Sequence, residues 1–508
     1  MDATSFTSTD LGAAAVVDAL VAAGFSVGSS STVARTMLDT FDGRLHAAGL
    51  RLELHRSAGQ ELVLRGGGPT EARVAVAERP RLAADVPAGP LRRRLAAVLD
   101  VRALLPVLTV TARMRTAVRR DPAGKVRAGI SVAERLTVES FASPPFAWVA
   151  TVEPLAGYAK DAESADRLLS SMGLRRTAGG LLDAVAGALV VDVAGFRGSP
   201  TVPLDPGEPA LDAFRKVLSN LAAAIDANRP GTIDHIDPEF LHDLRVAVRR
   251  TRSVLSEARG VLPPEVRRRF REGFGWLGQA TGPARDLDVY VIEWADYVAP
   301  LGADAAALGP VLDDIVSRRA AAHATLAKVL QSSRYRQLLT GWHRWVDRPA
   351  VDRSAKDACR DIAKVAGARI QRAQAQVLDR GRGIDAGTPA EELHELRKDA
   401  KKLRYLLECL GGLYAPPARK AFVQRLKALQ DNLGEHQDAE VHVTQLREMS
   451  RSLQSCGPDT LVAVGRLTES LEGRRRAARD EFAQRFAAYD TKRTAETLAA
   501  LLRSTGGG

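Results

Sequence analysis

The alternation of apolar and polar residues changes its period along the chain and divides it into two regions. From about residue 30 to residue 155, several segments alternate apolar and polar side chains as half-buried strands do, with Gly or Pro between several of them. These segments are "LRLELHR", "QELVLRG", "ARVAVAER", "LTVTARMRTAVRR" and "RAGISVAERLTV". The pattern predicts a mostly antiparallel β region with helices near its ends.

A segment rich in Pro and Gly, "GFRGSPTVPLDPGEP" at residues 195–209, follows this region. Beyond it the apolar period becomes helical and stays helical to the C-terminal "STGGG". We therefore predict an α+β protein with more than one domain. Its expected parts are a β-rich domain at 1–195, a linker at 196–209 and an all-α domain at 210–508.

The helical region contains an internal repeat. The segment "HDLRVAVRRTR" at 242–252 recurs as "HELRKDAKKLR" at 394–404, an offset of 394 − 242 = 152 residues. The same offset aligns "LGQATGPARDLDVYV", which starts at Leu277, with "LQDNLGEHQDAEVHV", which starts at Leu429. An ungapped register over two separated motifs indicates a duplicated unit.

Each unit is long enough for roughly four helices, which predicts two pseudo-symmetric four-helix bundles side by side. The first unit is expected at about 210–347 and the second at about 355–505. Before the second basic motif, Thr388 and Glu391 have the spacing of a capping box, so a helix is expected to start there.

The composition is that of a soluble globular protein, with 45% hydrophobic and 26% charged residues, and it excludes the disordered and fibrous classes. The formal net charge of +11 suggests a polyanionic partner, either nucleic acid, another phosphate polymer or an anionic surface. Because the excess of positive charge is spread along the chain, the clustering of cations must decide between these partners.

The cysteines and the N-terminus favour a cytoplasmic protein. Cys359, Cys409 and Cys456 lie far apart and form no CxxC pair, which argues against a zinc site or a disulfide scaffold. The longest early apolar stretch, "LGAAAVVDALVAAGF", contains Asp18 and is too short to span a bilayer. No export signal, membrane anchor or membrane partner is predicted.

The two basic motifs place a stripe of cations beside the apolar face of a helix. At about 100° per residue, the first stripe borders the face that contains Leu244 and Val248. Positions 246–248 differ between the repeats, whereas the cationic positions keep their charge. The stripes consist of His242, Arg245, Arg249 and Arg252 in the first repeat and His394, Arg397, Lys401 and Arg404 in the second.

Cations beside a core need partly buried acids, or they line a groove whose ligand supplies negative charge. Asp286 and Asp438 could each neutralise one cation, while successive turns about 5.4 Å apart would suit a linear chain of phosphates. Long cationic side chains also extend over apolar neighbours into solvent, which is the alternative interpretation. We favour a binding stripe because the duplication preserves the charges, and for "RRRFR" at 267–271 we favour a solvated face over a place at its rim.

The histidines and aromatic residues give no second site. For His242 and His394, a structural hydrogen bond is as good an interpretation as a ligand contact, and neither has a second metal ligand three or four residues on. Trp276, Trp342 and Trp345 are expected in the core. With aromatic residues at 5%, no stacking ladder for nucleic-acid bases is visible.

The paired motifs "HDLRVAVRRTR…RDLDV" and "HELRKDAKKLRYLLE…LQDNLGEHQD" resemble the two halves of a CHAD domain, over roughly residues 206–505. The resemblance implies two four-helix bundles related by a pseudo-twofold axis, with basic helices lining a channel that binds inorganic polyphosphate. It also implies a binding or targeting module rather than a catalyst. The residues that match the family's motif are His242, Arg245, Arg249, Arg250, Arg252, His394, Arg397, Lys398, Lys401, Lys402 and Arg404.

The N-terminal region resembles the CYTH, or triphosphate tunnel, fold in "MLDTFDGRLHAAGLRLELHR" and "RMRTAVRR". It lacks the family's Glu-x-Glu-x-Lys motif, and "VATVEPLAGY" keeps only Glu153 where paired acids are expected. Because a divalent metal needs several oxygen ligands to act on a triphosphate, the resemblance implies a degenerate domain that binds anions without turnover or only scaffolds.

The sequence thus predicts a non-catalytic protein that binds inorganic polyphosphate, without a cofactor, a metal or catalytic residues, in the cytoplasm or at polyphosphate granules. The alternatives are a nucleic-acid-binding protein and a metal-dependent triphosphatase or polyphosphatase that acts through the N-terminal domain. The sequence predicts no particular oligomeric state.

Overall fold

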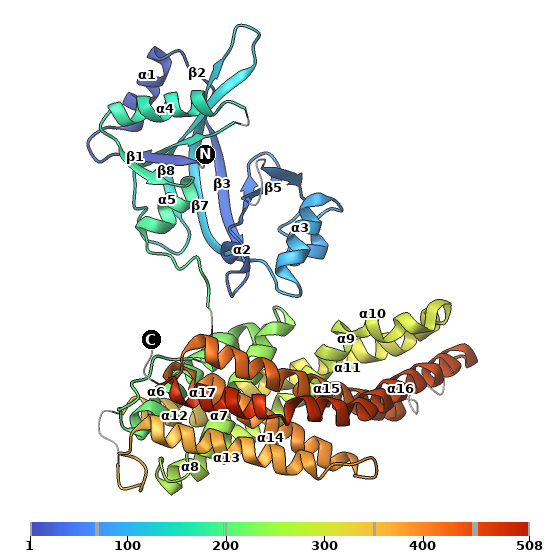
Figure 1. The fold of residues 1–508 in the computed structure, drawn as a ribbon. Helices are drawn as coiled ribbons and strands as arrows, with labels where there is room; N and C mark the ends of the chain where they lie inside the picture. Colours follow the sequence, from blue (N-terminus) through green and yellow to red (C-terminus); the bar gives the residue numbers. More distant parts are fainter. Residues whose placement is uncertain are drawn as a thin grey trace. The chain divides into compact units, whose positions relative to one another are not determined.

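The computed structural model confirms the α+β, multidomain architecture, with an antiparallel sheet followed by a helical region (Figure 1). The chain divides into two compact units, Met1–Arg197 and Gly198–Gly508. The structure describes residues 3–66, 71–155, 157–196, 198, 201–348, 352–449 and 456–505.

The first unit is built on one sheet in which all strand pairs are antiparallel, in the order β10-β1-β9-β8-β7-β3-β4-β5-β6, with β2 beside β7. This sheet is consistent with a CYTH-like fold. Its strands are β1 (Thr4–Thr7), β2 (Ser26–Val27), β3 (Ser31–Asp39), β4 (Arg51–Arg56), β5 (Gln60–Arg65), β6 (Ala72–Ala75), β7 (Leu105–Arg120), β8 (Val126–Val138), β9 (Trp148–Glu153) and β10 (Arg175–Ala178).

The five segments predicted as strands form β4 to β8, so the alternation pattern is confirmed there. The sheet extends beyond the predicted range, because β1 and β10 pair with each other at its edge. Both have only four residues, "TSFT" and "RRTA", and neither contains an apolar run that marks a strand. The helices of this unit are α1 (Ala13–Ala22), α2 (Arg44–Ala47), η1 (Ala83–Asp85), α3 (Pro90–Leu99), α4 (Ala159–Ser171) and α5 (Leu181–Ala188).

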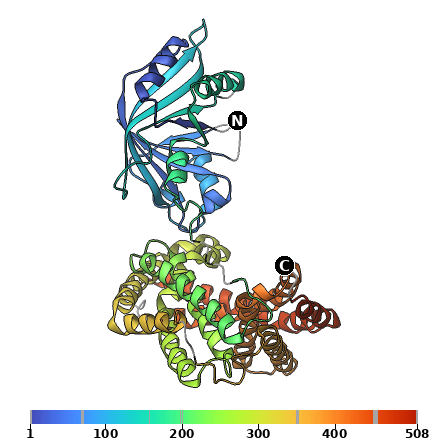
Figure 2. The ribbon, with the colours of Figure 1, turned by 90° about the vertical axis from the view of Figure 1, so that its left-hand side faces the viewer.

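The second unit is helical throughout, and its two groups of helices are coloured green to yellow and orange to red (Figure 2). The helices up to residue 346 are α6 (Ala210–Ile233), α7 (Pro238–Glu257), α8 (Pro264–Ala280), α9 (Gly282–Ile292), α10 (Trp294–Val298), η2 (Ala299–Leu308), α11 (Gly309–Gln331) and α12 (Ser333–Val346). The later ones are α13 (Ile362–Arg382), α14 (Ala390–Cys409), η3 (Gly411–Leu413), α15 (Pro416–Met449), α16 (Pro458–Tyr489) and α17 (Lys492–Arg503).

The helix boundaries follow the sequence repeat. Adding 152 to the bounds of α7 gives those of α14, and the start of α6 maps onto the start of α13. Each repeat therefore has four long segments and a shorter fifth. The equivalent segments are α6 and α13, α7 and α14, the pair α8–α9 and the single helix α15, α11 and α16, and α12 and α17. The first repeat breaks between α8 and α9 because Pro283, which lacks an N–H, stands where the continuous α15 has Glu435.

The two basic helices begin differently. At α7 the Asp237 carboxylate accepts hydrogen bonds from the backbone N–H groups of Glu239 and Phe240, as an N-cap does. At α14 the residue before the helix is Pro389, and the Thr388 hydroxyl instead bonds with Asp385. The predicted capping box is wrong at Thr388, although the helix starts where the repeat predicts.

One hydrophobic core runs through both repeats, with Leu244 and Val248 of α7 and Leu396 and Leu403 of α14 in the same cluster. The core position of the tryptophans is confirmed for Trp342 and Trp345, which are buried. Trp276 is only partly buried, and the Arg334 guanidinium lies 4.3 Å from the centre of its ring. Because the apolar faces of α7 and α14 share this core, their cationic stripes are held next to each other.

Residues 201–209, the later part of the Pro- and Gly-rich segment, pack on the helices. The Thr201 hydroxyl donates a hydrogen bond to the backbone oxygen of Glu408, and Leu204 is buried in the helical core. In the described part of the chain, no helix is long and apolar enough to cross a membrane.

Candidate functional site

A pocket of about 870 Å³ opens where α7, α8 and α14 meet, and we call it the basic pocket. Among the described residues that line it, eight are cations and two are carboxylates. The lining consists of Arg249, Arg252, Ser253 and Ser256, then Pro264, Glu265, Arg267, Arg268, Arg271 and Glu272, and finally Lys398, Lys401, Lys402 and Tyr405.

The structure brings five of the eleven predicted binding residues into this pocket, from both repeats. It also adds a third wall from α8, where the sequence favoured a solvated face for "RRRFR". Arg268 and Arg271 are indeed exposed, and with Arg267 they line the pocket. The five predicted residues in the lining are Arg249, Arg252, Lys398, Lys401 and Lys402.

Arg249 and Lys401 occupy the same position in the two repeats and lack a neutralising acid. In the described structure, no carboxylate lies within ion-pair distance of either side chain, and the Arg249 Nε is buried without a hydrogen-bond partner. Burial, together with the charges of Arg397 and Arg249, lowers the pKa of Lys401 to about 7. A negatively charged ligand beside Lys401 would therefore stabilise its protonated form.

Arg245 and Arg397 lie on the same stripe but have local partners. Arg245 donates a hydrogen bond of 3.2 Å to the Thr281 hydroxyl, and Arg397 forms an ion pair of 3.1 Å with Asp438. Burial lowers the pKa of both guanidinium groups, and it raises the pKa of Asp286, which lies near Arg245. The prediction that Asp438 neutralises one cation is confirmed, and Asp286 acts on Arg245 through its charge.

Two other predicted cations, Arg250 and Lys402, join the two repeats, and a third, Arg404, pairs within its own helix. Arg250 of α7 donates two hydrogen bonds, of 2.6 and 3.0 Å, to one oxygen of Glu408 at the end of α14. Lys402 of α14 forms a 2.7 Å ion pair with Glu257 at the end of α7, and Arg404 also pairs with Glu408. Since Arg250 and Lys402 are equivalent in the repeat, these contacts cross the interface in both directions.

The remaining predicted residues have mixed surroundings. His394 forms a short hydrogen bond through Nδ1 with the Gln437 side chain of α15, which matches the structural interpretation of this histidine. His242 is half-buried on α7 and lies outside the pocket lining, as does His394. Lys398 pairs with Glu395 on its own helix at 2.6 Å and keeps 59% of its side chain exposed.

Glu257 and Glu408 lie outside the two basic motifs and were not predicted as site residues. Arg404 and Glu408 are four residues apart, so a local helical pair could have been expected. Their role between the repeats depends on how α7 and α14 pack, which no spacing within one motif reveals.

A cluster of charged residues on the sheet, around Glu53 and Glu153, forms mutual ion pairs. Glu53 of β4 is buried, with the Arg65 guanidinium and the His55 ring each 2.7 Å from its carboxylate. Burial would raise the pKa of Glu53, but the hydrogen bond from His55 and the charges of Arg65 and Arg35 lower it to about 2. Arg35 and Arg65 also each lie 3.5 Å from the carboxylate of Glu153.

Part of the helical unit matches a known protein family. Residues 216–447 match the family model of the CHAD domain, which confirms the resemblance seen in the paired motifs. An uncharacterized protein of Mycobacterium tuberculosis, found in two strains, is 25% identical over 296 residues. That match spans 56% of this chain and 56% of the length of those relatives.

Two solved structures are similar to parts of the chain. The CHAD domain from the plant Ricinus communis is 27% identical, with a TM-score of 0.47, and the match covers 61% of this chain and 98% of that one. PptA from Streptomyces chartreusis is 20% identical, with a TM-score of 0.44, and the match covers 55% of this chain and 99% of that one.

Proposed function

We propose that this chain, whose residues 216–447 are a CHAD domain, binds inorganic polyphosphate in the basic pocket without reacting with it. The observation that carries the proposal is the pairing of Arg249 and Lys401, two partly buried cations from equivalent positions, with no acid at ion-pair distance in the described structure. Burying such charges is unfavourable unless a ligand supplies the opposite charge.

The shape and charge of the pocket favour a polymer over a single phosphate. The cations come from three helices, and the lining has six more positive than negative residues, from eight cations and two carboxylates. Its volume of about 870 Å³ is far larger than the roughly 30 Å³ that one water occupies, so several phosphate groups fit. Arginines bind phosphate oxygens through paired N–H groups, and lysines act as point charges.

A nucleic acid would share the electrostatic attraction but would also need surfaces on which bases stack. Tyr405 is the one aromatic residue in the described lining, and it is 9% exposed. Competition between long-chain polyphosphate and duplex DNA for the protein, at 50 and 200 mM salt, tests this choice. We expect polyphosphate to displace DNA at both salt concentrations. Preferential retention of DNA at the higher salt would favour the nucleic-acid alternative.

The enzyme alternative depends on the sheet unit. Two acids of this unit that the sequence places where metal ligands would be sought are Glu53 and Glu153, and both are in ion pairs with Arg65. Neither carboxylate is therefore free to bind a divalent metal without breaking those pairs. Incubation of the full chain with tripolyphosphate and Mg²⁺ or Mn²⁺ should release no phosphate above the rate without protein. Metal-dependent release would revive the triphosphatase alternative.

A further inference from the structure

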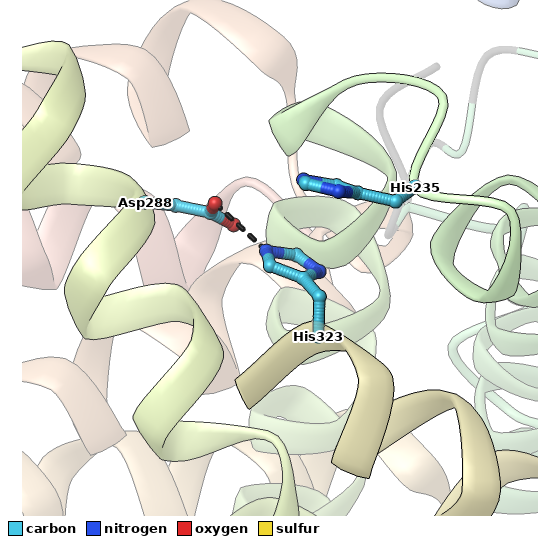
Figure 3. A group of neighbouring side chains, drawn as sticks. All are labelled: His235, Asp288 and His323. Atoms are coloured by element: carbon cyan, nitrogen blue, oxygen red, sulfur yellow. Dashed lines mark hydrogen bonds and ion pairs between the residues drawn. The ribbon is translucent and has the colours of Figure 1, made fainter. Parts of the chain in front are cut away.

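We propose that His235, Asp288 and His323 form a binding site for one divalent transition-metal ion of the zinc class. The three residues come from separate segments: His235 from the connection between α6 and α7, Asp288 from α9 and His323 from α11 (Figure 3). One ligand atom from each lies within 4.8 Å of the other two. Two imidazoles and a carboxylate, with water in the remaining position, are a donor set that zinc and its neighbours accept.

Asp288 provides a carboxylate oxygen that lacks a partner. The residue is fully buried, and its Oδ1 accepts hydrogen bonds from the Arg319 Nε at 2.6 Å and the His323 Nε2 at 2.9 Å. Its Oδ2 is buried and has no hydrogen-bond partner in the described part of the chain. A buried polar atom without a partner is unfavourable, and a bound cation would satisfy this one.

The contact of His235 with Arg319 indicates which of its ring nitrogens carries a lone pair. The Arg319 Nη2 lies 2.9 Å from the His235 Nε2. Because a guanidinium only donates hydrogen bonds, this nitrogen must present a lone pair. The two imidazole rings are stacked, with centroids 3.7 Å apart, which disfavours a charge on both. An ion bound at the His323 Nε2 would take the place of the proton that this nitrogen donates to Asp288, and that proton would move to Nδ1 or to solvent.

The Arg319 guanidinium occupies the position in which a bound metal ion would contact Asp288 and His235. Its guanidinium contacts both Asp288 and His235, so it supplies positive charge to the carboxylate and occupies the lone pair of the imidazole. The Arg319 side chain is 22% exposed, so it can withdraw towards solvent when an ion binds. Arg319 is thus expected to compete with the metal rather than to assist it.

The site is independent of the basic pocket and belongs to the first repeat alone. The 152-residue offset maps His235, Asp288 and His323 onto Gly387, Glu440 and Arg475, which cannot form the same donor set. His235 also has a positive φ of 48°, an uncommon conformation for a residue other than glycine. A bound ion would join this connection to α9 and α11.

The test is a titration of the chelator-treated full-length protein with Zn²⁺ by calorimetry, and with Co²⁺ by visible absorption. We expect one ion per chain, and at least about tenfold weaker binding for His235→Ala, since even outer-shell partners have effects of that size. The matched control is His343→Ala, which removes a half-exposed histidine that pairs with Asp226 on the surface. The control should bind like the wild type.

A second variant separates metal binding from folding. Arg319→Gln removes the competing guanidinium and keeps all three ligands, so it should bind Zn²⁺ at least as tightly as the wild type. Zn²⁺ should also raise the melting temperature of the wild type and of Arg319→Gln, but not that of His235→Ala. Equal affinity in the wild type and His235→Ala, or equal loss in Arg319→Gln and His235→Ala, would overturn the proposal.

Discussion

Lys401 of α14 lies beside Arg249 of α7, and the two cations occupy equivalent positions in the repeats, since 249 + 152 = 401. Burial lowers the pKa of Lys401 to about 7, and repulsion from the positive charges of Arg397 and Arg249 adds to this shift. The duplication has thus placed two like charges at the interface of its own halves. We interpret this arrangement as a binding site whose buried cations lower the folding stability of the unliganded protein. A bound anion would neutralise them and restore that stability.

The first prediction concerns the stability of the unliganded protein. Lys401→Met should raise the free energy of unfolding at pH 7 by about 0.5–2 kcal/mol, because it removes an unfavourable charge and keeps the volume. It should also weaken polyphosphate binding. Urea unfolding and a binding titration of the same preparation measure the two effects. A variant that is both less stable and weaker in binding would contradict this explanation.

The second prediction is a pH dependence of stability. The pKa of Lys401 is about 7 in the folded protein against an ordinary value of 10.5, so the unfolded state binds more protons between these values. The contribution of Lys401 to the free energy of unfolding should therefore increase as the pH rises from 7 towards 10. The difference in unfolding free energy between Lys401→Met and the wild type should shrink over the same range.

The third prediction is a pH dependence of binding. A phosphate chain binds the charged form of Lys401, so wild-type affinity should fall as the pH rises above 7, by at most about tenfold per pH unit. Lys401→Arg keeps its charge and should not show this loss. Comparing the two proteins at pH 6.5 and 8.5 also controls for ionisation of the ligand. Parallel profiles would show that polyphosphate binding is not coupled to the protonation of Lys401, which would contradict this prediction.

The fourth prediction separates two adjacent arginines. Arg250→Ala breaks the ion pair with Glu408 and should lower the free energy of unfolding by about 1–3 kcal/mol, with little change in polyphosphate affinity. Arg249→Ala should weaken binding without such a loss of stability. Chemical unfolding and binding assays on both variants make the comparison. If Arg250→Ala reduced affinity as strongly as Arg249→Ala, the division into structural and binding cations would be wrong.

Much of the helical unit could be predicted because the repeat fixes the same boundaries twice, as it does for α7 and α14. The roles of neighbouring cations could not. Arg249 and Arg250 are adjacent in the sequence, but about 100° of helical rotation turns one towards the pocket and the other towards Glu408. Whether a cation meets an acid depends on the packing of α7 against α14.

Two other features, the α8 wall of the pocket and the histidine cluster, could not be predicted because they depend on how distant helices pack. The wall that Arg267, Arg268 and Arg271 give to the pocket depends on where α8 packs, and "RRRFR" has the composition of an ordinary solvated helix face. His235 and His323 are 88 residues apart, and His323 has no His, Cys or carboxylate three or four residues away. Only the folding of α9 and α11 brings them to Asp288.

The most direct test of the central claim is the affinity of long-chain polyphosphate for the wild type and for the double variant Arg249→Gln, Lys401→Gln, at near-physiological salt. Lys492→Gln, Arg493→Gln removes the same formal charge from exposed positions of α17 and is the matched control. We expect the pocket variant, still folded, to lose at least about tenfold in affinity and to show a shallower dependence of log K on log salt, by about one to two. The control should change little. Equal affinities in the pocket variant and the control would show that polyphosphate does not bind at Arg249 and Lys401.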